Sequence, residues 1–327
     1  MRAEPVLLPD ITSPPEVMVD VLELIAIFNE YNVSRVDEVR SSLFQQKDEQ
    51  DSDISSNDRE AEEINDKIEN EINSRISSLG DSYPYEFSSD GEELTLVSNW
   101  KEEKYSFYIT CLLTSHLTRD SSLNGETPIV LIQRLRNRVF QVMATLAMAG
   151  LARGNAASIG WPREGSESVM SALKRAERYR PSYITLDEPG ELTPPREKDG
   201  GIDIIAWSMT DDRPPPTHFY YGQVASGHNW QDKPVELEVR MFEMNYFKYA
   251  PGCNRCYATL IPFRVMNSNS EWYRDHSKHG SILDRTRLPK YALEGINLAE
   301  KGVWMDESNN VSQITEWINN IIEYYSN

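Results

Sequence analysis

Cysteine, long apolar runs and excess basic charge are all scarce in this chain, and each absence excludes a class of protein. Three cysteines among 327 residues are typical of a reducing compartment and too few for a disulfide scaffold. No apolar run approaches the roughly 20 residues that cross a bilayer, and the N-terminus lacks the basic and apolar segments of an export signal. We therefore expect a cytoplasmic protein without a membrane association.

Basic residues are outnumbered, since 33 Lys and Arg face 52 Asp and Glu, for a formal net charge of −19. This argues against a protein that coats nucleic acid regardless of sequence, because such binding needs Lys and Arg to neutralise phosphates. Almost half of the charge lies between Asp48 and Glu71, where eleven acidic residues accompany two basic ones. Such a segment is typical of a solvated helix or linker, with mimicry or repulsion of nucleic acid as the alternative. The remaining chain leaves room for a local basic groove.

The first part of the chain is predicted to be mostly helical, up to a domain boundary near residue 122. Ile64, Ile68, Ile72 and Ile76 recur at helical spacing, which predicts an amphipathic helix. The Asp, Ser, Asn, Gly and Pro residues between 119 and 128 mark the boundary. The predicted elements of residues 1–122 are helices within 15–47 and over 58–79 and 105–117, an irregular connection over 47–57, and a β-hairpin over 83–97.

From residue 123 to 327 helices and strands alternate, which predicts an α/β sandwich. Pro128 at the first helical position and Gly154 just past the last one bound a long helix. The other predicted elements are strands at 157–161, 202–207, 219–225, 255–265 and 282–283, and helices at 166–179, 237–246 and 314–325.

Two of these predicted strands each carry one polar residue among apolar ones. Asp203 lies in Gly-Gly-Ile-Asp-Ile-Ile-Ala-Trp and Gln223 in Phe-Tyr-Tyr-Gly-Gln-Val-Ala. A carboxylate in such a strand is costly unless something pairs with it. An acid and a Gln on neighbouring strands, followed by Lys233, are the parts of a site that binds a hard metal ion for phosphodiester hydrolysis. The alternatives are an Asp that caps nearby amides, a Gln that hydrogen-bonds within the sheet and a Lys on the surface.

Residues 130–290 resemble the PD-(D/E)xK, or restriction-endonuclease-like, nuclease superfamily, and more narrowly a divergent branch among prokaryotic anti-phage defence proteins. The resemblance rests on the segments GGIDIIAW and GQVASGHNWQDK, and on an IPF strand followed by ILDRTRL. It implies a mixed sheet flanked by helices. It also implies a Glu on the first helix, an Asp on one strand and an Asp/Glu-x-Lys on the next, around one or two Mg²⁺ (or Mn²⁺) ions.

The resemblance assigns a role to four residues: Asp203 as the principal metal ligand, Gln223 as a neutral ligand, Lys233 as the base that orients water, and Gln141 as a residual contact from the helix. Two positions depart from the family pattern. Ala225 stands where the Lys is expected, so Lys233 would replace it from the following helix. Gln141 stands where the helix Glu is expected, and Glu167 or Glu177 is the alternative source of that acid, unless both are ordinary surface residues.

Basic residues near these positions are the expected contacts to DNA. Arg134 and Arg138 lie four apart on the long helix, so they either line a phosphate groove or form a solvated basic face. His228 follows the Gln223 strand and is expected at the rim of the site. Arg285, in ILDRTRL, is expected either to contact phosphate or to lie at the sheet edge.

Two functions are consistent with these residues. The first is a metal-dependent DNA endonuclease of anti-phage defence, within a multi-subunit system. The second is a catalytically degenerate subunit of the same fold that binds protein or senses nucleic acid. Because the chain has no motor motif, an ATPase or helicase is the expected partner, and the helix over 58–79 is a docking element for it or for a second copy. Cys253 and Cys256 form only half of a zinc site, and the 20-residue gap to His276 and His279 argues against completion by these histidines.

Overall fold

The computed structural model describes residues 6–10, 12–45, 54–117, 122–123, 127–160, 163, 167–191, 193, 199–210, 212, 214–227, 229–232, 234–265 and 269–326. The chain divides into two compact units, the first comprising Met1–Ile132 with Ile318–Asn327 and the second Gln133–Trp317. The boundary expected near residue 122 therefore lies about ten residues too early, because the first turn of the long helix belongs to the first unit. Among the described residues, no helix is both long and apolar enough to cross a bilayer.

The first unit combines helices with a three-stranded sheet of order β1-β3-β2. The predicted hairpin is present, since β2 and β3 pair antiparallel with Tyr85 opposite Leu96. The region expected to be helical from 15 to 47 is two helices separated by a strand, which pairs with β3 after a turn at Asn32 in the left-handed region. The elements are α1 (Pro15–Phe28), β1 (Val33–Arg35), α2 (Val36–Gln45), α3 (Ile54–Leu79), β2 (Tyr85–Phe87), β3 (Glu93–Leu96) and α4 (Glu103–Leu117).

The second unit is an α/β domain on a mixed five-stranded sheet of order β10-β9-β7-β6-β4. β6 pairs antiparallel with both of its neighbours, β4 and β7. β9 pairs parallel with both of its neighbours, β7 and β10. The long helix runs from α5 through a π-helical turn to α6. From residue 129 on, the elements are α5 (Ile129–Arg134), the π turn (Leu135–Val139), α6 (Phe140–Ala152), β4 (Gly154–Ser158), α7 (Val169–Glu177), β5 (Ile184–Thr185), β6 (Ile204–Ser208), β7 (His218–Val224), α8 (Val235–Tyr246), β8 (Phe247–Tyr249), β9 (Asn254–Leu260), α9 (Asn269–His279), β10 (Ser281–Leu283), α10 (Leu288–Glu300) and α11 (Ser312–Ser326). Of these, α5 begins and α11 ends in the first unit.

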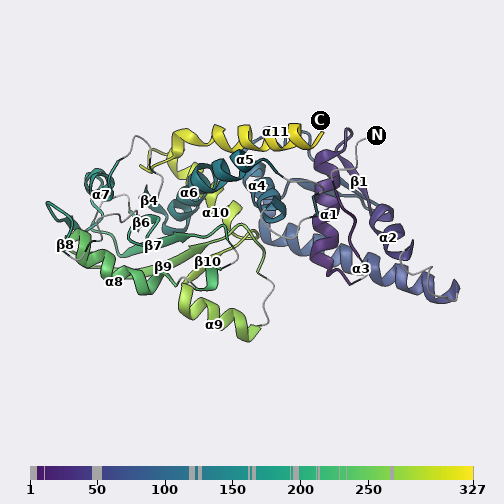
Figure 1. Cartoon of the computed structure of the whole chain (residues 1–327), viewed down its shortest axis with the longest axis horizontal. Coiled ribbons are helices and arrows are strands. Elements are labelled where there is room, and N and C mark those ends of the chain that lie inside the picture. Colours follow the sequence, from purple (N-terminus) through teal and green to yellow (C-terminus); the bar gives the residue numbers. More distant parts are fainter. Residues whose placement is uncertain are drawn as a thin grey trace. The chain divides into compact units, whose positions relative to one another are not determined.

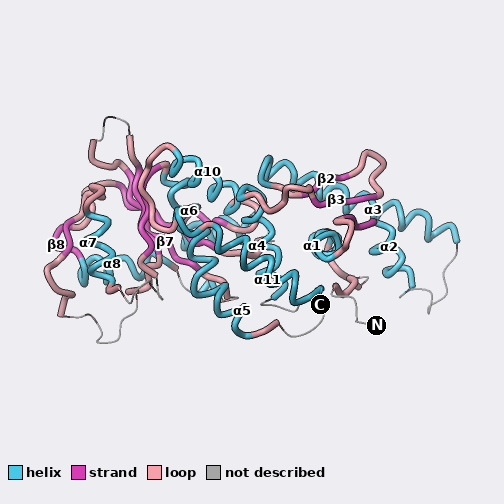
Figure 2. The backbone as a smooth tube through the Cα atoms, turned by 90° about the horizontal axis from the view of Figure 1, so that it is seen from above, coloured by secondary structure: helices cyan, strands magenta, loops and turns pink. Residues whose placement is uncertain are grey.

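Helices cover both faces of this sheet (Figures 1 and 2). On one face α6 packs on β4, β6 and β7, and α10 packs on α6. On the other face α7 and α8 enclose a core that contains Trp207, Phe219 and Phe242. Glycine permits the close approach of α6 and α10, since a Cβ at Gly295 would lie 2.1 Å from the Leu146 carbonyl oxygen. The short strands β4 and β6 are thereby almost wholly buried.

Candidate functional site

Asp203 stands directly before β6, at the end of the strand that lies beside β4 and β7. Its N–H donates to the Gly222 carbonyl at 3.0 Å, and its own carbonyl accepts from the N–H groups of Ile159 at 2.8 Å and Gly160 at 2.7 Å. Its side chain is fixed as well, because the Val224 N–H donates to Oδ2 at 2.8 Å. The sheet therefore holds this carboxylate in one orientation.

Gln141 reaches the same strand end from α6. Its Nε2 donates to the Asp203 carbonyl oxygen at 3.1 Å and to Ser158 Oγ at 3.0 Å. Gly160 leaves the space for this approach, because a Cβ there would lie 2.7 Å from Asp203 Oδ1 and 3.1 Å from Gln141 Nε2. Gln141 thus contacts the main chain of Asp203 and contributes no charge there.

Gln223 lies in β7 and shares a pocket with Asp203. The residue is 8% exposed, and its Oε1 has no hydrogen-bond partner among the described residues. Both residues line an open pocket of about 460 Å³. A buried carbonyl oxygen without a partner costs about 1–3 kcal/mol, and carboxylate and amide oxygens are the ligands of hard cations. The structure therefore brings Asp203, Gln223 and Gln141 to one end of the sheet.

Three further acids, which the sequence did not single out, line this pocket: Asp199, Asp232 and Glu238. Glu238 is in the first turn of α8 and packs on Gly201, where a Cβ would lie 2.6 Å from the Glu238 Cγ. Nevertheless, no three Asp, Glu, His or Cys side chains within the described residues are grouped closely enough to bind a metal ion. The donors that fit a hard cation here are the Asp203 carboxylate and the Gln223 amide oxygen, which supply one charge and so imply weak binding.

Lys233 and His228, the predicted base and rim residue, lie outside the described residues. Asp232 and Pro234, which flank Lys233 in the sequence, line the pocket, and α8 begins at Val235.

The arginines expected to contact DNA have intramolecular roles. Arg134 Nη2 pairs with Glu316 at 2.8 Å, and Arg138 Nη2 pairs with Glu307 at 2.7 Å. Acids thus offset the charge of both side chains.

Arg285 is only 2% exposed, so the expected phosphate contact is wrong for this residue. Its N–H donates to the Phe263 carbonyl at 3.1 Å beyond the edge strand β10, which agrees with the sheet-edge alternative.

Glu167 and Glu177 do not supply the missing acid of the Asp203 pocket. Glu167 pairs with Arg175, and Glu177 Oε1 accepts from Thr185 Oγ1 at 2.9 Å. Neither residue is among those that line the pocket. Both carboxylates thus have partners within the chain.

Asp306 is a partly buried acid beside the site that no sequence motif marked. Its Oδ2 accepts from the Ser158 N–H at 3.0 Å and pairs with Arg175 Nη2 at 2.7 Å. Burial raises its pKa, despite the hydrogen bond from Arg175. Since Ser158 Oγ also accepts from Gln141, Asp306 supports the residue that contacts Asp203.

Cys253 and Cys256 belong to no group of three or more metal-ligating side chains in the described part of the chain. Burial raises the pKa of both the Cys253 and the Cys256 thiols, which favours the protonated form over the thiolate that binds zinc.

No family model, curated protein or solved structure matches the chain, so its function is inferred from the residues of the site.

Proposed function

We propose that this chain is a metal-dependent nuclease of the PD-(D/E)xK superfamily that hydrolyses DNA phosphodiester bonds in prokaryotic anti-phage defence. The observation that supports this most is the shared pocket of Asp203 and Gln223. There Gln223 Oε1 is buried without a partner among the described residues, as a ligand awaiting a cation would be. Mg²⁺ or Mn²⁺, when bound, lowers the pKa of a coordinated water and offsets charge on the scissile phosphate.

The order of elements supports the same proposal. Along the chain come, in this order, a helix with Gln141, a strand preceded by Asp203, a strand with Gln223 and a further helix. Gln141 contacts the Asp203 carbonyl, and Asp203 shares a pocket with Gln223. The resemblance of residues 130–290 implies this arrangement for the superfamily. A mixed sheet flanked by helices is also the architecture that it implies.

Each residue has a distinct part in the proposed reaction. Asp203, held by the Val224 N–H, would hold the cation, and Gln223 would offer it a neutral oxygen. Gln141 fixes the strand end through the Asp203 carbonyl. Lys233 orients the attacking water and stabilises negative charge.

The charge of the pocket makes binding of the substrate depend on cations. Asp199, Asp203, Asp232 and Glu238 line it together, and none of its described lining residues is basic. A phosphodiester is repelled by such a lining. Divalent ions bound there would, together with Lys233, offset this charge for an approaching DNA strand.

The test is cleavage of plasmid and linear DNA by the full chain with Mg²⁺ or Mn²⁺. We expect metal-dependent nicking that Asp203→Asn lowers by about 10²-fold or more. Asp212→Asn removes an exposed charge outside the pocket and should leave cleavage unchanged. Equal loss in both variants, or cleavage that survives in Asp203→Asn, would overturn the assignment of the site.

The second proposal is a catalytically degenerate subunit that binds protein or senses nucleic acid. It is favoured by the lack of a three-ligand metal grouping among the described residues and by the acids that hold Arg134 and Arg138. In that case folded protein neither cleaves DNA nor binds Mn²⁺ in a calorimetric titration. An ATPase or helicase, or a second copy docked on α3, would then be the partner to add to the same cleavage assay.

A further inference from the structure

A second pocket lies at the other end of β6 from Asp203. It has a volume of about 430 Å³ and is lined by Asn155, Arg178, Tyr179, Arg180, Trp207, Ser208, Met209, Pro214, Pro216, Gly302 and Trp304. Ser208 ends β6 opposite Gly154 of β4, whereas Asp203 precedes the first residue of β6. At about 3.3 Å per residue the two strand ends are roughly 16 Å apart. The pocket is therefore separate from the proposed metal site.

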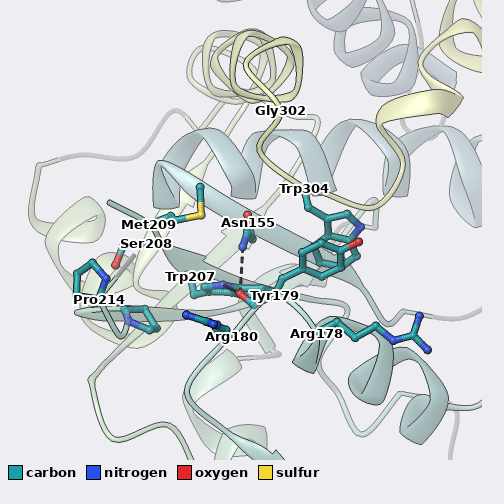
Figure 3. A pocket seen from close by; sticks show the side chains of 11 residues that line it. Asn155, Arg178, Tyr179, Arg180, Trp207, Ser208, Met209, Pro214, Gly302 and Trp304 are labelled. Atoms are coloured by element: carbon teal, nitrogen blue, oxygen red, sulfur yellow. Dashed lines mark hydrogen bonds between the residues drawn. The ribbon is translucent and has the colours of Figure 1, made fainter. Parts of the chain in front are cut away.

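One wall of this pocket is a pair of stacked aromatic rings (Figure 3). The centroids of Tyr179 and Trp304 are 3.9 Å apart and their planes differ by 6°. The backbone of the wall is fixed, since Trp207 Nε1 donates to the Tyr179 carbonyl at 3.1 Å. Tyr179 nevertheless stays 38% exposed. A rigid aromatic surface that remains open to solvent is suited to a flat ring of a ligand.

Arg180 supplies positive charge beside this wall. In Figure 3 its side chain lies in the pocket next to Trp207, while Arg178 extends outward past Tyr179. Within the described part of the chain, neither arginine forms an ion pair, in contrast to Arg134, Arg138 and Arg175. No acidic residue is among those that line the pocket, although the chain carries a net charge of −19. The local field thus favours an anion.

We infer that this pocket binds a nucleotide, with the base against the Tyr179–Trp304 wall and the phosphate on Arg180. The two features together select the class of ligand, because an aromatic wall alone would suit many flat or apolar groups and an arginine alone any anion. Bases stack on aromatic side chains regardless of their identity, and guanidinium groups pair with phosphate. The volume falls within the roughly 300–1,000 Å³ typical of small-molecule sites. The inference stands independently of the nuclease proposal.

The experiment is a titration of the full chain with AMP, CMP and a ten-residue oligothymidylate at one salt concentration and without divalent metal, followed by tryptophan fluorescence. The chain has seven tryptophans, so Trp304→Phe assigns the signal while keeping an aromatic wall. We expect saturable quenching that is largely lost in Trp304→Phe. Adenosine lacks the phosphate and ribose 5-phosphate lacks the base, so these two probes measure what each group contributes to binding. Both should bind at least about tenfold more weakly than AMP.

Arg180→Asn is the decisive variant, because φ at residue 180 is 57° and Asn tolerates this left-handed conformation. It should weaken AMP binding by about tenfold, whereas Arg240→Asn, which removes an exposed arginine of α8, should have no effect. Asp203→Asn should also leave binding unchanged, which separates this result from the fate of the metal site. Tighter binding of the oligonucleotide would identify a nucleic-acid strand as the source of the nucleotide, and tighter binding of AMP a free nucleotide.

Lack of saturable binding of all three nucleotide probes up to about 5 mM, by variants with native circular dichroism, would overturn the inference. Equal affinity of wild type and Arg180→Asn for AMP would do the same, as would ribose 5-phosphate binding as tightly as AMP.

Discussion

Arg75 Nη1 lies 2.8 Å from Glu23 Oε2 in the interior of the first unit, where the two side chains are 1% and 0% exposed. The same guanidinium pairs with Asp20 at 2.8 Å and with Glu71 at 2.6 Å. Burial by itself would lower the pKa of Arg75, but the Glu23 carboxylate and its neighbours more than offset this, so the pKa is raised well above its usual value. One buried cation thus joins acids of α1 and α3.

Loss of this cation should destabilise the first unit strongly. Arg75→Met leaves several acids buried without their partner, and breaking a buried ion pair in this way costs about 3–5 kcal/mol. The free energy of unfolding in urea measures the effect. Arg35→Met is the matched control, because it breaks a solvent-exposed pair with Glu93 that is worth at most about 1 kcal/mol. Equal, small effects of the two substitutions would contradict the role assigned to Arg75.

The close contact of α6 with α10 gives a second prediction. Gly295→Ala would place a Cβ 2.1 Å from the Leu146 carbonyl oxygen, and backbone atoms cannot move aside as a flexible side chain can. Overpacking of this kind costs about 1–3 kcal/mol, although Ala is the better helix former. Gly252→Ala, at a position with open space around its Cβ, should change the unfolding midpoint little. A stabilised Gly295→Ala would show that the helices separate without cost.

Residue patterns predicted the elements whose signal is local. The amphipathic α3 was evident because Ile68 and Ile72, both buried, recur at helical spacing, and the β2–β3 hairpin because a turn pair separates two apolar runs. Two helices were missed. α10 carries a Pro at its start and buried Leu288, Ala292 and Ile296, a period of four that would have identified it. α9 is polar apart from Trp272 and Tyr273, so periodicity could not reveal it.

The site divides in the same way. Asp203 and Gln223 were found because a polar residue inside an apolar strand is conspicuous along the chain. Glu238 was missed because its place in the pocket depends on its contact with Gly201, 37 positions away in sequence. Arg285 was expected either to contact phosphate or to lie at the sheet edge. The sequence could not decide between the two, because the burial of this side chain depends on the tertiary packing around the sheet edge.

A third prediction tests the donor set of the proposed metal site. Gln223→Glu adds a negative charge where Oε1 is now an unpartnered amide oxygen among the described residues. Because affinity for hard cations rises with the charge of their ligands, Mn²⁺ should bind about tenfold more tightly, or about 1.4 kcal/mol, in a calorimetric titration.

Asn254→Asp controls for this substitution, since it adds the same charge at the exposed start of β9, outside the pocket. A gain of Mn²⁺ affinity in both variants would mean that net charge alone attracts the cation. Unchanged affinity in Gln223→Glu would exclude this residue as a ligand.

The last prediction concerns pH and rests on His279, which is 1% exposed and packs with its ring centroid 5.0 Å from that of Trp230. Burial lowers the pKa of His279 below its ordinary value, although the Asp275 carboxylate opposes the shift. In the unfolded chain this imidazole is protonated near pH 6.5, whereas in the folded chain it stays neutral to a lower pH. Protonation therefore favours the unfolded state as the pH falls below about 6.5, and the stability that the neutral ring provides is lost as the pH falls through the folded pKa.

His279→Phe keeps a ring against Trp230 and removes the titration. The difference in unfolding free energy between wild type and His279→Phe, measured in urea from pH 7.5 down to pH 5, should shift in favour of the variant on acidification. Carboxylates that titrate in the same window are common to both proteins and cancel in this difference. His276, whose pKa is also lowered by burial and by Arg287, remains in both, so the comparison isolates His279. A difference that stays constant with pH would show that the folded protein protonates His279 as readily as the unfolded chain.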